Sequence, residues 1–239
     1  MIWGRDQVRI FFLIELTTME ITHRPIAAGQ LGVSNAITDV HGGSVMPANA
    51  IMIDIETMAV TPDAAIVTIG ACFFDPRAGV DQLIDEKFLV RMSLTSNESM
   101  GRRIQAGTVE WWLKQSTDAQ MGLFDGFVTN LKQGLVMFRQ WFQNETRNRP
   151  ETVWANDPDF DVVILKSAHD SCGEMWPLQF WQNRSVRTAG EMAYADHKER
   201  RAVLKAIRES VGTHHRADDD AVAQAIFVAH CFDKLEAFE

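Results

Sequence analysis

The sequence is poor in cysteine, has no excess of basic residues and contains no long apolar run. Its three cysteines form no C-x-x-C pair, which argues against a disulfide framework or a zinc cluster and favours a reducing cytoplasm. Because the net charge is −9, a polyanion would need a local basic patch to bind. The apolar run from Ile10 to Ile14 is too short for a signal peptide, and no run approaches the ~20 residues that span a bilayer. We therefore expect a cytoplasmic protein that does not cross a membrane.

The chain divides into two regions of different composition. After a short apolar patch, residues 1–48 are rich in glycine, serine, asparagine and alanine, which predicts a loosely ordered extension. A start codon placed too far upstream is an alternative explanation, with Met19 or Met46 as the true start. Residues 49–239 have tighter hydrophobic patterning. Since 46% of the chain is hydrophobic, this region predicts one domain with a sizeable core.

Hydrophobic periodicity from residue 50 onward predicts an α/β domain. Three consecutive strands, expected to be antiparallel, are predicted at 50–56, 64–75 and 86–93, because apolar and β-branched residues fill these segments. The later predicted elements are helices at 108–120, 128–145, 159–172, 198–210 and 218–235, and short strands at 151–155 and 184–188. Thr108 is the predicted N-cap of the first helix. Strands followed by alternating helices and strands predict a mixed sheet flanked by helices.

The first strand carries two acids inside an otherwise apolar stretch. In IMIDIET, Asp54 and Glu56 are two residues apart, so their side chains project from one face while Ile53 and Ile55 point the other way into the core. Two adjacent carboxylates repel each other unless a cation neutralises them, and hard divalent cations prefer oxygen ligands. The pair therefore indicates half of a metal site. Acids that simply reach solvent at a strand end are the alternative.

Two later stretches supply further acids and a histidine. In VWANDPDFDVVIL, Asp161 falls in the first turn of a helix, where an acid also stabilises the helix dipole without any ligand. In HHRADDDAVAQA, Asp220 lies early in a helix and His215 lies on the loop before it. A histidine beside the acids is suited to take a proton from water near neutral pH. His214 with Asp219 has the same spacing and is the alternative pair.

The motifs DIET, NDPDFDVVIL and HRADDDA together resemble those of the DEDDh exonucleases, which belong to the ribonuclease-H-like superfamily. The flanking stretches TVEWWLKQSTDAQ and FWQNRSVRTAGEM are most similar to the compact bacterial and phage 3′–5′ exoribonuclease-like branch, which includes a phage exodeoxyribonuclease. The resemblance covers about residues 50–232. The second motif departs from the usual Asn-Gly-x-x-Phe-Asp of this branch, because Asp157 replaces the glycine.

The resemblance implies a ribonuclease-H-like α/β fold, with a mixed five- or six-stranded sheet flanked by helices, and a two-metal-ion 3′–5′ exonuclease. It implies that two divalent ions, Mg²⁺ or Mn²⁺, bind between four acids and the terminal phosphodiester, with Asp54 contacting both ions. The other three acids are Glu56, Asp161 and Asp220. His215 would deprotonate the attacking water, and the product would be a nucleoside 5′-monophosphate. The implied substrate is single-stranded RNA or DNA or a duplex 3′ end, and the relatives make a homodimer plausible.

Further residues are candidates for substrate contacts. Thr57 follows the acid pair and is placed to meet the terminal sugar. Trp112 is the tryptophan that we expect to stack on a base. Four arginines are candidates for phosphate contacts in this acidic chain, with Arg187 the best of them and Arg184, Arg102 and Arg103 the others. A strand-end threonine, a core tryptophan and solvated arginines are the structural alternatives.

Two other functions share parts of this pattern. Phosphatases of the haloacid-dehalogenase type also carry two acids after an apolar strand, but they need an aspartate where this chain has Glu56. A ribonuclease-H-like module without turnover would bind nucleic acid and leave it intact. The presence of all five expected catalytic residues favours the enzyme over both alternatives.

Overall fold

The computed structural model describes residues 50–77, 84–124, 127–143 and 150–237. The extension predicted at 1–48, with its alternative starts Met19 and Met46, lies outside the described residues. Among the helices of the described ranges, none combines the length and the apolar character needed to cross a membrane.

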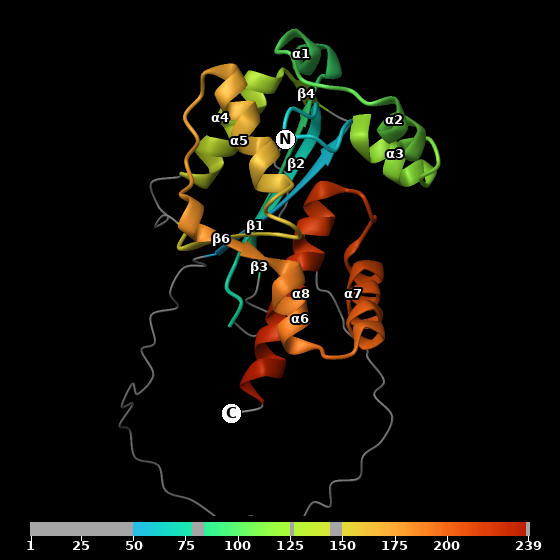
Figure 1. Cartoon of the computed structure of the whole chain (residues 1–239), viewed down its shortest axis with the longest axis vertical. Coiled ribbons are helices and arrows are strands. Elements are labelled where there is room, and N and C mark those ends of the chain that lie inside the picture. The colour runs from blue at the N-terminus through green and yellow to red at the C-terminus, as the bar shows by residue number, and fades with distance from the viewer. Residues whose placement is uncertain (1–49, 78–83, 125–126, 144–149, 238–239) are drawn as a thin grey trace, which may run out of the picture. The chain divides into compact units, whose positions relative to one another are not determined.

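A mixed six-stranded sheet forms the centre of the domain (Figure 1). Its strands are β1 (Ala50–Thr57), β2 (Ile66–Phe74), β3 (Ile84–Met92), β4 (Val128–Thr129), β5 (Thr152–Ala155) and β6 (Asn183–Ser185). They lie in the order β4-β3-β2-β1-β5-β6. The first three strands are antiparallel neighbours, whereas β5 pairs in parallel with β1 and β6, and β4 with β3. The predicted mixed sheet is confirmed, and β1 lies inside it with a partner on each side.

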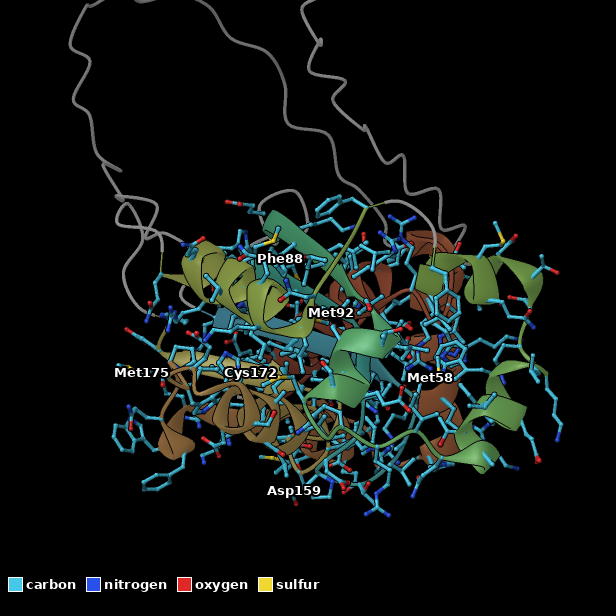
Figure 2. All side chains as sticks on the ribbon, turned by 90° about the horizontal axis from the view of Figure 1, so that it is seen from above. Met58, Phe88, Met92, Asp159, Cys172 and Met175 are labelled. Carbon is cyan, nitrogen blue, oxygen red and sulfur yellow. The ribbon has the colours of Figure 1, made fainter. Side chains whose placement is uncertain are left out.

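Helices cover both faces of the sheet. They are α1 (Leu94–Ser99), α2 (Ala106–Trp112), α3 (Thr117–Phe124), α4 (Leu131–Phe142), α5 (Asp161–Cys172), α6 (Val186–Ala193), α7 (His197–Val211) and α8 (Ala217–Glu236), with a 3-10 helix η2 at Phe180–Gln182. One core contains α4 and α5, and a second contains α6, α7 and α8 (Figure 1). Phe88, Met92 and Cys172, labelled in Figure 2, belong to the first core.

Both faces of β1 are buried, which explains its nearly continuous apolar sequence. Ile53 and Ile55 join the core with α4 and α5, as the alternation predicts. Met52 joins the core with α8 on the other face. Asp54 and Glu56 continue the Met52 face, so their carboxylates point toward α8 rather than to open solvent.

A glycine of β2 lets α8 begin in direct contact with the sheet. Gly70 lies opposite Asp54 in the register of β1 with β2. A Cβ at this position would overlap the backbone of Ala217 and Asp218, so only a residue without a side chain permits the approach. This contact fixes the first turn of α8 beside β1 and places Asp220 near Asp54.

Three predicted boundaries are wrong, and in each case a capping side chain starts a helix. The helix predicted at 108–120 is two helices, because Ser116 accepts a hydrogen bond from the first turn of α3. The next helix starts only after Asn130, whose side chain caps α4 and is preceded by the short strand β4. The strand predicted at 184–188 ends at Ser185, whose hydroxyl caps α6.

Two smaller predictions also need correction. The N-cap position of α2 is Gln105, which makes no side-chain capping bond, and Thr108 lies inside the helix. Helices α1 and α6 and the short strand β4 were not predicted. The six residues of α1 are too few for a periodic pattern.

Candidate active site

Three carboxylates from two elements meet at one end of β1. Asp54 and Glu56 project from β1, and Asp220 reaches them from the start of α8. One carboxylate oxygen of each lies within 4.8 Å of those of the other two. Glu56 is 8% exposed and Asp220 is 5% exposed, while Asp54 is partly buried. The three carboxyl groups are therefore largely shielded from bulk solvent.

Asp161, the first residue of α5, is 4% exposed and lines the same cleft of about 350 Å³. Its Oδ1 accepts a hydrogen bond from the backbone N–H of Ile55 at 3.3 Å. The pairing of β1 with β5 ends at Ile53, so the carboxylate serves as an acceptor for β1 where β5 no longer does. Asp161 thus starts a helix and also faces the cleft, and the two interpretations of this acid are compatible.

Asp220 is held by the loop before α8 and by α7. Its Oδ2 accepts a hydrogen bond from the backbone N–H of His215 at 2.7 Å. Its Oδ1 lies 3.1 Å from Nδ1 of His214 and 3.9 Å from Nε of Arg208. The carboxylate therefore connects the acids of β1 with both predicted histidines and with an arginine of α7.

Burial and mutual repulsion make the acids difficult to ionise together. Burial raises the pKa of Asp54 well above its ordinary value, and repulsion from Asp161 and Asp220 raises it further. Burial and then repulsion from the other three acids raise the pKa of Glu56 in the same way. Burial is also the main cause that raises the pKa of Asp161 from 3.8 to about 7. Such a site is stabilised by a multivalent cation.

His215 lies between the acids and two tryptophans of α2. Its ring meets those of Trp111 and Trp112 edge-on, with centroids 5.0 and 5.8 Å away, and stacks on His214 at 3.8 Å. Its φ of 67° is in the left-handed region, which is uncommon for a residue with a side chain. Burial lowers the pKa of His215 to about 4, so its imidazole is neutral at neutral pH.

His214 contacts the same carboxylate as His215, and both rings line the cleft. The alternative pairing of His214 with Asp219 is not formed. Asp219 instead accepts the backbone N–H of Thr213 and pairs with Lys87 at 3.1 Å. Both histidines therefore contact Asp220, His214 through its ring and His215 through its backbone N–H.

Two side chains at the site were not predicted from the sequence. Gln224 donates from Nε2 to Oδ1 of Asp54 at 2.7 Å, and its Oε1 is buried without a hydrogen-bond partner among the described residues. It lies four residues after Asp220, and helical spacing could have placed it on the same face of α8. Arg208 lines the cleft from α7, and no pattern in the sequence connects it to the acids.

A second pocket, of about 790 Å³, adjoins the acids and includes Glu56 in its lining. Trp111, Trp112 and Thr57 line it as well. Trp112 is 4% exposed and donates from Nε1 to the carbonyl of Thr57 at 2.9 Å, whereas Trp111 is 44% exposed. The Thr57 hydroxyl donates to the carbonyl of Ala59 at 2.7 Å. Trp112 and Thr57 thus form a hydrogen-bonded part of the pocket wall, and the ring of Trp111 is more exposed to solvent than that of Trp112.

The predicted arginines have different surroundings. Arg187 lines the cleft, with Nη1 3.6 Å from Oδ2 of Asp157. The carbonyl of Asp157 accepts the backbone N–H groups of Phe160 and Asp161, so the turn closes without the glycine that is usual in this motif. Arg102 is 5% exposed and donates to three backbone carbonyls and to a serine hydroxyl. The prediction that Arg102 contacts phosphate is wrong, because its guanidinium holds buried backbone together.

The donor set fits divalent cations. Within the described ranges, no lysine or arginine forms an ion pair with Asp54 or Glu56. The neighbouring Asp218, in contrast, pairs with Arg216 at 2.8 Å and with Lys87 at 3.9 Å. Clustered carboxylate oxygens without cationic partners are the ligands that Mg²⁺ and Mn²⁺ prefer.

Comparisons with known proteins agree with this chemistry. Residues 49–232 match the family of the 3'-5' exoribonuclease Rv2179c-like domain. An exodeoxyribonuclease of Enterobacteria phage T4 is 25% identical over 158 residues, which are 57% of this chain and 68% of that relative. The crystal structure of cell-death related nuclease 4 (CRN-4) matches with a TM-score of 0.52 at 13% identity, over 77% of this chain and 63% of that one. The nuclease domain of 3'hExo, a DEDDh family member bound to rAMP, matches with a TM-score of 0.51 at 12% identity, over 77% of this chain and 91% of that domain.

The solved structures identify the mixed sheet and its flanking helices as a ribonuclease-H-like α/β fold. The nuclease family match argues against the phosphatase interpretation. DEDDh nucleases use divalent metals, in agreement with the carboxylate cluster. The chain belongs to the 3'-5' exoribonuclease Rv2179c-like family, and it is a 3′–5′ exonuclease with the DEDDh arrangement of residues.

Proposed function

We propose that this protein removes nucleoside 5′-monophosphates one at a time from the 3′ ends of single-stranded RNA or DNA, with two divalent ions, Mg²⁺ or Mn²⁺, at the acid cluster. The observation that carries the proposal is the meeting of Asp54, Glu56 and Asp220 within 4.8 Å, beside a histidine pair and in a cleft that Asp161 also lines. Acids that are buried and mutually repelling are costly for a fold to keep, so their presence supports a bound cation.

The four acids Asp54, Glu56, Asp161 and Asp220 would hold the ions. Bound divalent ions supply charge stabilisation for the phosphate and a lower pKa for water. The chain itself keeps the carboxylates in place. Gln224 orients Asp54 through a 2.7 Å hydrogen bond, and the N–H of Ile55 orients Asp161.

His215 is the proposed acceptor for the proton of the attacking water. The bond from the water oxygen to phosphorus forms as the bond from phosphorus to the 3′ oxygen breaks. The imidazole takes the proton of the water and releases it to solvent, and the departing 3′ oxygen takes a proton from solvent. The tryptophans Trp111 and Trp112 limit water around this ring. His214 contacts Asp220 through Nδ1 at 3.1 Å, which supports a positioning role and keeps it as the alternative base.

The pocket beside Glu56 would receive the terminal nucleoside. Trp111 offers an accessible ring for stacking on the base. Trp112, the residue expected from the sequence, would form part of the wall of the same pocket, where its Nε1 donates a hydrogen bond to the carbonyl of Thr57. Arg187 lines the acid cleft and would meet a phosphate once its contact with Asp157 opens.

A time course with 5′-labelled single-stranded RNA and DNA of equal sequence tests the proposal. Wild type is compared with Asp54→Asn and with Asp159→Asn, which changes an exposed acid near the cleft, in Mg²⁺, Mn²⁺ or chelator. The expected result is a ladder that shortens from the 3′ end with either ion, for wild type and Asp159→Asn only. Strands that stay intact in both ions would refute the proposal. The ratio of the RNA and DNA rates assigns the substrate.

A further inference from the structure

A groove beside the candidate active site is lined by basic side chains of α7. It has a volume of about 540 Å³, and Arg201, Lys205 and Arg208 line it together with His214. The three cationic residues are four and then three positions apart, so they share one face of the helix and span ~10 Å along its axis. In a chain with a net charge of −9, this is a local concentration of positive charge.

The groove lies beside the acid cleft. Arg208 and His214 line both cavities, and both side chains approach Asp220. A strand whose 3′ end occupies the acid cleft must leave it along some surface. The groove is a candidate for this surface, because Arg208 and His214 line both the groove and the acid cleft.

The cations of the groove are available for a ligand. Arg201 has no ion pair within the part of the chain that the structure describes. Lys205 pairs only with Glu209 of its own helix among these residues, at 3.6 Å and with both side chains largely exposed, an interaction of little energetic weight. Nε of Arg208 is buried without a hydrogen-bond acceptor from the described ranges, and the carboxylate oxygen that it approaches, on Asp220, is 3.9 Å away.

We propose that the α7 groove, defined by Arg201, Lys205, Arg208 and His214, binds the phosphates of the nucleotides on the 5′ side of the bond that is cut. The inference rests on the proposed exonuclease function and names how that site holds the rest of its strand. Phosphate contacts of this kind position a strand without reading its sequence. The groove therefore acts equally on every sequence and more strongly on longer strands.

The salt dependence of binding tests the groove. Affinity for a labelled single-stranded 12-mer is measured with chelator present, so that the strand stays intact, across a range of salt concentrations. The slope of log affinity against log salt is negative, and each lost phosphate contact reduces its magnitude by ~0.7 for single strands. Arg201→Ala with Lys205→Ala should thus reduce this magnitude by ~1.4. The matched control, Lys132→Ala with Lys166→Ala, removes the same charge from α4 and α5 on the other face of the sheet and should leave the slope as in wild type.

A gain-of-binding variant guards against effects of misfolding. Glu209 lines the groove and pairs with Lys205, so Glu209→Gln should bind the 12-mer more tightly than wild type. In turnover, Arg201→Ala with Lys205→Ala should raise KM for the 12-mer several-fold more than KM for a dinucleotide, which is too short to reach along the groove. An equal effect at both lengths, or a slope like that of wild type, would overturn the inference.

The two proposals fail in different ways. If wild type binds the 12-mer but shortens it in neither ion, the exonuclease proposal fails and the groove is still judged by the slopes. If wild type shortens the strand and the α7 variant binds with an unchanged slope, the groove inference fails and the exonuclease proposal stands.

Discussion

Removing one negative charge from the acid cluster should stabilise the metal-free protein while abolishing its activity. Asp161 is the best position for this test, because an asparagine at this site keeps an oxygen that can accept the N–H of Ile55. Burial raises the pKa of Asp161 from 3.8 to about 7, which corresponds to ~4 kcal/mol of preference for the neutral form in the folded state. Since local relaxation reduces this value, we expect Asp161→Asn to gain ~2–4 kcal/mol at pH 8.

The sign of the pH dependence follows from the direction of the shift. The folded state holds the proton of Asp161 more tightly than the unfolded state, so ionisation favours unfolding. The stabilising effect of this proton is fully present below about pH 4 and is lost as the pH rises through about 7. The amide that replaces the carboxyl group in the Asp161→Asn variant has no such proton to lose. The stability difference between Asp161→Asn and wild type should therefore be near zero at pH 4 and largest above pH 7.

Thermal unfolding in chelator between pH 5 and pH 8 measures this difference. A gain of ~2–4 kcal/mol should raise Tm by ~4–16 °C in a domain of this size. Asp159→Asn is the matched control, because Asp159 is exposed and lies only two positions away; it should follow wild type at every pH. Excess Mn²⁺ should stabilise wild type more than Asp161→Asn, since the ion binds the folded state through these acids. An Asp161→Asn protein that is no more stable at pH 8, or whose advantage is the same at pH 5, would refute the electrostatic reasoning.

Three further predictions concern the residues that position the site. Gly70→Ala should lower kcat by ~10²-fold and reduce stability by ~1–3 kcal/mol, because the added methyl group pushes the start of α8 away from β2; Gly122→Ala, where a Cβ meets open space, should keep wild-type kcat and Tm. Gln224→Leu should weaken metal binding ~10–100-fold in a titration followed by calorimetry, because Asp54 loses its 2.7 Å hydrogen bond; unchanged metal affinity would contradict this role. His215→Asn should lower kcat by ~10²–10⁴-fold and His214→Asn by less than ~10-fold, with asparagine tolerated at the left-handed φ of position 215; the opposite order of the two rates would make His214 the base.

Local geometry predicts from the sequence which element carries each acid. Asp54 and Glu56 follow from the two-residue period of a strand, and the structure puts their carboxylates on the same side, facing α8. Asp161 and Asp220 follow from the first turns of two helices, which begin at Asp161 and Ala217. Their meeting at one site is a long-range feature, which only the resemblance to the DEDDh exonucleases implied.

Three helix boundaries were predicted wrongly, although the sequence contains the capping residues that mark them. Ser116, Asn130 and Ser185 each accept a hydrogen bond from the backbone N–H three residues later. Capping residues mark where a helix begins. Hydrophobic periodicity did not show these boundaries, because apolar residues lie on both sides of each capping residue. Reading the caps before the periodicity would have separated α2 from α3 and started α4 and α6 at their observed residues.

The cationic side of the site lies beyond what local patterns can show. Arg208 is 12 residues from Asp220 along the chain, and only the packing of α7 against α8 brings its Nε to 3.9 Å from that carboxylate. On the sequence, the spacing of Arg201, Lys205 and Arg208 is indistinguishable from that of any solvated helix face. Only the structure distinguishes this basic face of α7 from a solvated one, because it shows that the face ends beside the acid cluster. In the proposed arrangement the acids would hold the metal ions, and the α7 groove would hold the phosphates on the 5′ side of the bond that is cut.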